Sequence, residues 1–203
     1  MIEAITGLPG AGKTLMMMRK MMKEQKGSLM DRVFKLREDE PIITNFKVNE
    51  KMFPNAIYIS NDEISTLYDW ILQKKHFGAN IFLDEASILF PSLSWKSIPN
   101  DVIIALRQHR HAGYNMYYTA QDLDDVASGL RRVTQFATEV NGWSLLRFST
   151  YGCYSVRRGK INRKDRYDRG ILFHTNKLYN SYDTHFNIDT PDYVQMKGTS
   201  QAK

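Results

Sequence analysis

The chain has 203 residues, 42% of them apolar and 25% charged, and its formal net charge is +6. This composition excludes a disordered or collagenous chain, and the single cysteine excludes a disulfide framework and favours a reducing, cytoplasmic setting. The length suits one domain with its own hydrophobic core. No stretch approaches the ~20 apolar residues of a membrane-spanning helix, and the residues after Met1 do not have the pattern of a signal peptide.

The first 140 residues alternate between short apolar runs and segments with helical periodicity. Strands are predicted at 1–6, 42–46, 56–59, 81–83 and 114–119, and helices at 13–25, 61–72, 101–111 and 122–132. A charged connection covers 26–40, and a loop through Pro91 and Trp95 precedes the third helix. This alternation predicts an α/β fold with a mainly parallel sheet flanked by helices.

The pattern changes in the last third of the chain. Apolar runs at 143–148, 151–156 and 170–174 predict three strands joined by turns, which we interpret as a small antiparallel β appendage. We therefore expect an α/β core over 1–141, an appendage of the same domain over 142–196, and a frayed tail over 197–203.

A glycine-rich turn links the first strand to the first helix. It matches the phosphate-binding pattern G-x-x-x-x-G-K-[ST] as Gly7-Leu8-Pro9-Gly10-Ala11-Gly12-Lys13-Thr14. The glycines let backbone N–H groups surround a phosphate, and the helix that follows adds its positive N-terminal end. Lys13 is expected to reach the β- and γ-phosphates and Thr14 to bind Mg²⁺. The motif predicts a P-loop NTPase fold with ATP and Mg²⁺ as its cofactors.

Two adjacent acids end the apolar run 81–83. Asp84 stands where a Walker B acid would hold the Mg²⁺ shell. Glu85 could polarise a water for attack on the γ-phosphate. An acid at a strand end is a weak signal alone, but after a P-loop it predicts an ATP-hydrolysing enzyme.

Other groups could complete the catalytic site. If the strand at 114–119 lies between the strands that precede Lys13 and Asp84, Gln121 would point at the γ-phosphate; a polar loop residue is the alternative. An arginine finger raises hydrolysis rates by roughly 10³–10⁵ and is often supplied by a neighbouring subunit. Arg110 and Arg131 are the candidates, against the alternative that they lie on solvated helix faces.

A basic stretch covers residues 157–169, where seven basic side chains stand against two acidic ones. It could bind nucleic acid, anionic lipid or an acidic partner, or it could be a solvated hairpin tip.

Five methionines on the first predicted helix are expected to pack against the sheet: Met16, Met17, Met18, Met21 and Met22. His109 and His111 lack partners at ligand spacing, which argues against a transition-metal site there.

Several blocks together resemble the zonular occludens toxin (Zot) family, which includes the assembly ATPases of filamentous phages. The resemblance covers residues 1 to about 135 and is carried by the P-loop, Leu83-Asp84-Glu85-Ala86 with Phe90 and Trp95, Arg107-Gln108-His109-Arg110-His111-Ala112-Gly113, and Thr119-Ala120-Gln121. A late block also resembles the end of that family's cytoplasmic domain, Leu178-Tyr179-x-Ser181-Tyr182 with His185.

The resemblance implies a cytoplasmic ATPase domain at the inner membrane that drives virion assembly and extrusion. It implies homo-oligomers, with phage assembly proteins or phage DNA as partners, and membrane association through a later segment that this sequence does not contain. The family's toxin activity is attributed to its exported part and is not expected here.

Two other functions are left open by the residues. A small-molecule kinase would use the same phosphate cradle, although Glu85 beside Asp84 favours activation of water. A low-turnover nucleotide-dependent binding module is the other possibility. A GTPase is disfavoured because Asn176-Lys177 continues to Leu178-Tyr179 and gives no guanine signature.

Overall fold

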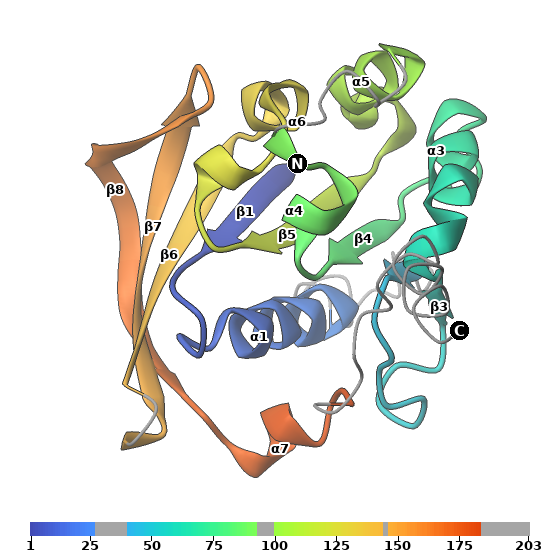
Figure 1. The fold of residues 1–203 in the computed structure, drawn as a ribbon. Helices are drawn as coiled ribbons and strands as arrows, with labels where there is room; N and C mark the ends of the chain where they lie inside the picture. The colour runs from blue at the N-terminus through green and yellow to red at the C-terminus, as the bar shows by residue number, and fades with distance from the viewer. Residues whose placement is uncertain (27–39, 93–99, 144–145, 184–203) are drawn as a thin grey trace, which may run out of the picture.

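One eight-stranded sheet organises the computed structural model, which describes residues 1–26, 40–92, 100–143 and 146–183 (Figure 1). The strand order is β3-β2-β4-β5-β1-β6-β7-β8, parallel from β3 to β6 and antiparallel for β7 and β8. The strands are β1 (Ile2–Thr6), β2 (Ile42–Thr44), β3 (Ala56–Tyr58), β4 (Asn80–Leu83), β5 (Asn115–Ala120), β6 (Phe136–Trp143), β7 (Phe148–Arg157) and β8 (Lys160–Phe173). The predicted mainly parallel sheet with antiparallel strands is confirmed.

Helices cover both faces of the parallel part of the sheet (Figure 1). They are α1 (Lys13–Lys26), α3 (Ile64–Leu72), α4 (Ala86–Leu89), α5 (Asn100–Arg107), α6 (Ser128–Val133) and α7 (Asn176–Tyr179), with 3₁₀ turns η1 (Asn61–Glu63), η3 (His109–Ala112) and η4 (Leu123–Asp125). Helices α1 and α7 lie on one face, and α3, α5 and α6 lie together on the other. None of the helices in the described ranges is long and apolar enough to span a membrane.

Each face of the sheet has its own apolar core. Under α1, the side chains of Ile5, Phe82 and Tyr117 pack against the helix, and Phe82 stacks on Tyr117 with ring centroids 4.8 Å apart. Four of the five methionines of α1 are fully or almost fully buried, and Met22 packs at the margin. The expectation that these methionines fill the space between helix and sheet is therefore confirmed.

One helix prediction in the core was wrong in detail, and one short helix was not predicted. The helix expected at 122–132 is split into η4 and α6, because Asp122 caps η4 by accepting a hydrogen bond from the Asp124 N–H (3.0 Å) and Val126 is extended. Helix α4 was missed, since four residues are too few to show a helical period. The charged connection at 27–39 and the loop around Trp95 lie outside the described residues.

Of the three predicted C-terminal strands, 151–156 lies within β7 and 170–174 matches the end of β8, but the one at 143–148 is wrong. Strand β6 begins at Phe136 and pairs in parallel with β1, so the predicted strand at 143–148 falls largely on the β6–β7 turn. The boundary expected at 141/142 falls inside β6. The basic stretch, expected as a turn, lies mostly within β8, and the turn itself consists of Arg158 (φ +54°) and Gly159 (φ +75°). Because β8 is an edge strand and largely exposed, it lacks the alternating apolar pattern that reveals a half-buried strand.

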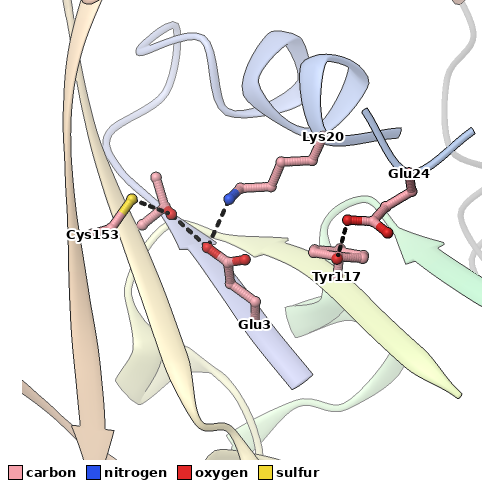
Figure 2. A network of polar contacts seen from close by, with 6 residues as sticks. Glu3, Lys20, Glu24, Tyr117 and Cys153 are labelled. Carbon is pink, nitrogen blue, oxygen red and sulfur yellow. Dashed lines mark hydrogen bonds and ion pairs between the residues drawn. The ribbon is translucent and has the colours of Figure 1, made fainter. Parts of the chain in front are cut away.

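A buried ion pair fixes α1 to the sheet beneath it (Figure 2). The Lys20 ammonium lies 2.9 Å from Glu3 Oε1, and the Thr138 hydroxyl donates to the same oxygen at 2.6 Å. The Cys153 thiol lies 3.3 Å from the Thr138 hydroxyl, and Glu24 accepts a hydrogen bond from Tyr117. Burial is the main cause that raises the pKa of Cys153, so this thiol is neutral and unreactive at neutral pH.

Removal of one partner of this pair should destabilise the fold strongly. Lys20→Met leaves the Glu3 carboxylate buried and unpaired, and we expect the free energy of unfolding to fall by about 3 kcal/mol in a urea titration. Glu3→Gln in the Lys20→Met background should recover most of that loss, because no charge is then left unpaired. Lys23→Ala on the exposed side of α1 is the control and should change stability little. An additive double variant would show that the two charges do not interact.

Candidate functional site

The P-loop connects the carboxyl end of β1 to the N-terminus of α1, at the edge where the parallel strands end (Figure 1). Gly10 (φ +74°) and Gly12 (φ +93°) adopt backbone conformations that favour glycine. The Gly7 N–H donates to the Gln121 carbonyl (3.1 Å), which anchors the start of the loop to the end of β5. The loop tip is open to solvent, with Leu8 78% exposed.

Lys13 lies at the first position of α1 with its ammonium folded over the loop. The ammonium donates to the Leu8 carbonyl (3.2 Å). Partial burial lowers the pKa of Lys13, while the nearby carboxylates of Asp84 and Glu85 oppose that shift. The side chain is therefore placed where an anionic phosphate would supply the negative charge that compensates its desolvation.

Asp84 is held by four polar contacts at the end of β4. The hydroxyls of Thr14 (3.0 Å, to Oδ2) and Thr119 (to Oδ1) both donate to its carboxylate. The buried Asn45 amide binds the Asp84 backbone at two points: its Oδ1 accepts from the backbone N–H (2.7 Å) and its Nδ2 donates to the carbonyl (2.9 Å). Burial raises the pKa of Asp84, and these hydrogen bonds only partly offset that effect.

This donor set fits a magnesium ion. A hydroxyl oxygen and a carboxylate oxygen, from Thr14 and Asp84, lie side by side, and oxygen ligands are the ones Mg²⁺ prefers. Because the Asp84 carboxylate is desolvated, a nearby cation would stabilise its charged form. The described residues contain no cluster of three or more His, Cys, Asp or Glu side chains, and Mg²⁺ in nucleotide sites takes its remaining ligands from phosphates and water.

Glu85 follows Asp84 directly and projects its side chain into solvent. Its backbone is left-handed (φ +50°), and its N–H donates to the Thr119 hydroxyl at 2.8 Å. Thr119 therefore accepts from Glu85 and donates to Asp84, which fixes the turn that holds both acids. The geometry gives Asp84 a half-buried, constrained carboxylate and Glu85 an accessible one.

The desolvation of Asp84 predicts a gain in stability when the charge is removed. A raised folded-state pKa means that stability is lost as pH rises from the usual aspartate range through the raised value, and at neutral pH the full penalty is present. Asp84→Asn should therefore raise the melting temperature of the metal-free protein at neutral pH, and the gain should vanish in acid. Asp62→Asn, at an exposed position, is the control. A lower melting temperature would show that the hydrogen bonds from Thr14 and Thr119 outweigh desolvation.

The strand order satisfies the condition on which the prediction for Gln121 depends, because β5 lies between β1 and β4. Gln121 follows β5 directly and is exposed beside the P-loop. Arg131 forms an ion pair with Asp124, and its helix α6 leads to the opposite end of the sheet, where the Gln135 N–H donates to the Ile2 carbonyl. Arg110 lies in η3, and its side chain is outside the described part of the structure. The roles of all three stay predictions.

Most of the basic stretch lies along the edge strand β8, and the face of β6, β7 and β8 that points away from α1 is covered by none of the described helices (Figure 1). Arg163 pairs with Glu139 (2.6 Å). Arg166 and Arg169 have no acidic partner among the described residues, and they border a hollow of about 440 Å³. The hollow is lined by Asn141, Thr150, Tyr151, Gly152, Tyr154, Arg166, Arg169, Gly170 and Ile171. The structure thus divides the positive charge between the β7–β8 hairpin tip, with Arg157, Arg158 and Lys160, and strand β8, with Arg163, Lys164, Arg166 and Arg169.

Sequence reasoning found the P-loop and the two acids but missed the groups that position them. Neither Asn45 nor Thr119 was assigned a role in the site, although they hold Asp84 and Glu85 in place. No local signal could reveal Asn45, because its contact with Asp84 spans 39 residues of sequence.

Comparisons with known proteins agree with this geometry. A family model described as "Zonular occludens toxin (Zot)" matches residues 1–185. The N-terminal domain of zonular occludens toxin from Neisseria meningitidis is 23% identical with a TM-score of 0.60, covering 90% of this chain and 98% of that one. The genome packaging NTPase B204 from Sulfolobus turreted icosahedral virus 2, in complex with AMPPCP, is 14% identical with a TM-score of 0.55, covering 79% and 95%. No curated protein matches the chain. These likenesses show a shared P-loop NTPase fold.

Proposed function

The chain belongs to the zonular occludens toxin (Zot) family, and we propose that it is an ATPase domain that binds ATP with Mg²⁺ and hydrolyses it. The observation that carries the proposal is the convergence of Lys13, Thr14, Asp84 and Glu85 at one edge of the sheet. The P-loop N–H groups and Lys13 would bind the phosphates, while Thr14 and Asp84 would hold Mg²⁺, which neutralises phosphate charge when bound.

Hydrolysis needs a base near the γ-phosphate, and Glu85 is the group to which we assign this role. Its exposed carboxylate lies one residue beyond the half-buried Asp84, in a turn fixed by Thr119. Glu85 would accept the proton of the attacking water while Lys13 stabilises the charge on the phosphates. Gln121, beside the loop, would orient the γ-phosphate or the water, and Arg110 or Arg131 of a neighbouring subunit would supply an arginine finger.

We further propose that this ATPase drives filamentous phage assembly and extrusion as a homo-oligomer at the cytoplasmic face of the inner membrane. Family membership supports this role, and a viral genome packaging NTPase shares the fold. Phage assembly proteins or phage DNA are the proposed partners. The unpaired Arg166 and Arg169 on the uncovered sheet face would suit an anionic partner such as DNA.

The competing functions are a small-molecule kinase and a low-turnover binding module. Equilibrium binding of ATP with Mg²⁺ and with EDTA, followed by analysis of the products, separates them. The proposal predicts tighter binding with Mg²⁺ and release of inorganic phosphate into water. Phosphoryl transfer to an added acceptor would support a kinase, and tight binding without any product would support a binding module.

A further inference from the structure

A chain of hydrogen bonds runs from α7 to the P-loop. The Ser149 hydroxyl lies 2.6 Å from the Ala11 carbonyl oxygen and 2.7 Å from His174 Nε2. His174 Nδ1 in turn lies 3.5 Å from the Tyr179 hydroxyl. Ser149 is fully buried and His174 is 7% exposed. The contact between Ser149 and Ala11 joins positions 138 residues apart in the sequence.

The chemistry of these groups fixes which one donates and which one accepts in each hydrogen bond. A carbonyl oxygen can only accept, so the Ser149 hydroxyl must donate its one proton to Ala11. The Ser149 oxygen then accepts from His174, which requires the proton on Nε2. This leaves Nδ1 to accept from the Tyr179 hydroxyl. Burial, with Arg147 nearby, lowers the pKa of His174, which keeps the ring neutral at neutral pH.

The hydrogen bond from Ser149 to the Ala11 carbonyl determines where the Gly12 N–H of the P-loop points. No cis peptide bonds occur in the described residues, and in a planar trans peptide the carbonyl and the following N–H point in opposite directions. With the Ala11 carbonyl held toward Ser149, the Gly12 N–H points away from β7. That N–H makes no hydrogen bond in the described part of the chain, as expected for a group reserved for a phosphate oxygen.

The fit around Gly12 leaves little freedom for this peptide. A Cβ at Gly12 would lie 2.8 Å from the Ser149 hydroxyl oxygen and 3.0 Å from His174 Nε2. A Cβ at Gly142 of β6 would lie 2.4 Å from the Ala11 Cα. The P-loop is therefore packed tightly against the β6–β7 hairpin on the same side as the hydrogen-bond chain.

We infer that Ser149 and His174 are positioning residues of the nucleotide site, which orient the Gly12 amide toward the phosphates from outside the P-loop motif. This inference rests on the proposed function, because it assumes that the P-loop binds a nucleotide. It assigns the C-terminal strands a part in phosphate binding: β7 supplies Ser149, and His174 directly follows β8.

The tautomer of His174 tests the chain without any nucleotide. Nitrogen-15 NMR of the 203-residue protein should show the Nε2–H tautomer at neutral pH, with a slowly exchanging Ser149 hydroxyl proton. An Nδ1–H tautomer would overturn the inference, because Ser149 could not then accept from the ring. This result does not depend on whether the protein binds ATP.

The affinity for ADP tests whether Ser149 and His174 contribute to phosphate binding by the P-loop. Ser149→Ala and His174→Met should each weaken ADP binding about 10-fold by calorimetry, which corresponds to one lost charge-assisted contact. The Gly12 amide resonance of both variants should no longer shift downfield when ADP is added. His174→Gln, which keeps a donor near the Nε2 position, should retain most of the affinity.

Ser155→Ala on the same strand is the matched control, since the Ser155 hydroxyl donates to Asp165 (2.6 Å) and not to the P-loop. It should leave ADP affinity within about twofold of wild type. Unchanged ADP affinity in Ser149→Ala, at any melting temperature, would overturn the inference and leave the proposed function intact. Failure of the wild-type protein to bind ADP would instead contradict the proposed function.

Discussion

Replacement of Glu85 with glutamine is expected to leave ATP bound and to slow its hydrolysis by about 10²–10⁴-fold, the usual contribution of a general base. Glutamine has nearly the same shape as glutamate but cannot accept the proton of the attacking water. The Glu85 side chain is exposed, and its backbone is held by the Thr119 hydroxyl, so the substitution should not disturb Asp84 or the P-loop. Phosphate release and ATP binding, measured on the same preparation, give the two parts of the result.

Asp62→Asn is the control for this experiment, because it also neutralises an exposed carboxylate, and Asp62 has no hydrogen bond or ion pair to the P-loop, Asp84 or Glu85 among the described residues. It should keep the wild-type rate. Hydrolysis that survives in Glu85→Gln would rule out Glu85 as the base.

Replacement of Lys13 with alanine is expected to weaken ATP binding by at least about 100-fold, or roughly 3 kcal/mol, because charge-assisted bonds to two phosphates are lost. In the structure the ammonium contacts only the Leu8 carbonyl within the loop, so little of the fold depends on it. The melting temperature without nucleotide should therefore stay close to that of wild type, while the stabilisation by ATP should disappear.

Lys23→Ala removes the same charge from the exposed side of the same helix and serves as the matched control. It should bind ATP as wild type does. Equal losses in both variants would mean that Lys13 acts only through the overall charge of α1 and not by direct contact with phosphate.

The parts of the site that could be predicted are those encoded by neighbouring residues. The P-loop needs its glycines and Lys13 at fixed spacing, and the Asp84–Glu85 pair follows an apolar strand, so both are legible in a single sequence. The position of β5 between β1 and β4 then brought Gln121 beside the loop, as the prediction required.

The parts that could not be predicted depend on contacts between distant residues. Ser149 and His174 reach the P-loop only because β6 pairs with β1 and carries β7 beside it. The position of β6 was missed, and with it these contacts. Only the end of β8 was predicted, because residues 160–169 of this edge strand are mostly exposed and polar and show no apolar alternation.

The central claim is that this domain is an ATPase, and the most direct test is phosphate release from ATP with Mg²⁺ at graded protein concentrations. We predict turnover that Lys13→Ala abolishes and that rises per molecule with concentration, as a neighbouring subunit completes the site with Arg110 or Arg131. Tight ATP binding with no turnover at any concentration would contradict the account and identify the chain as a nucleotide-binding module.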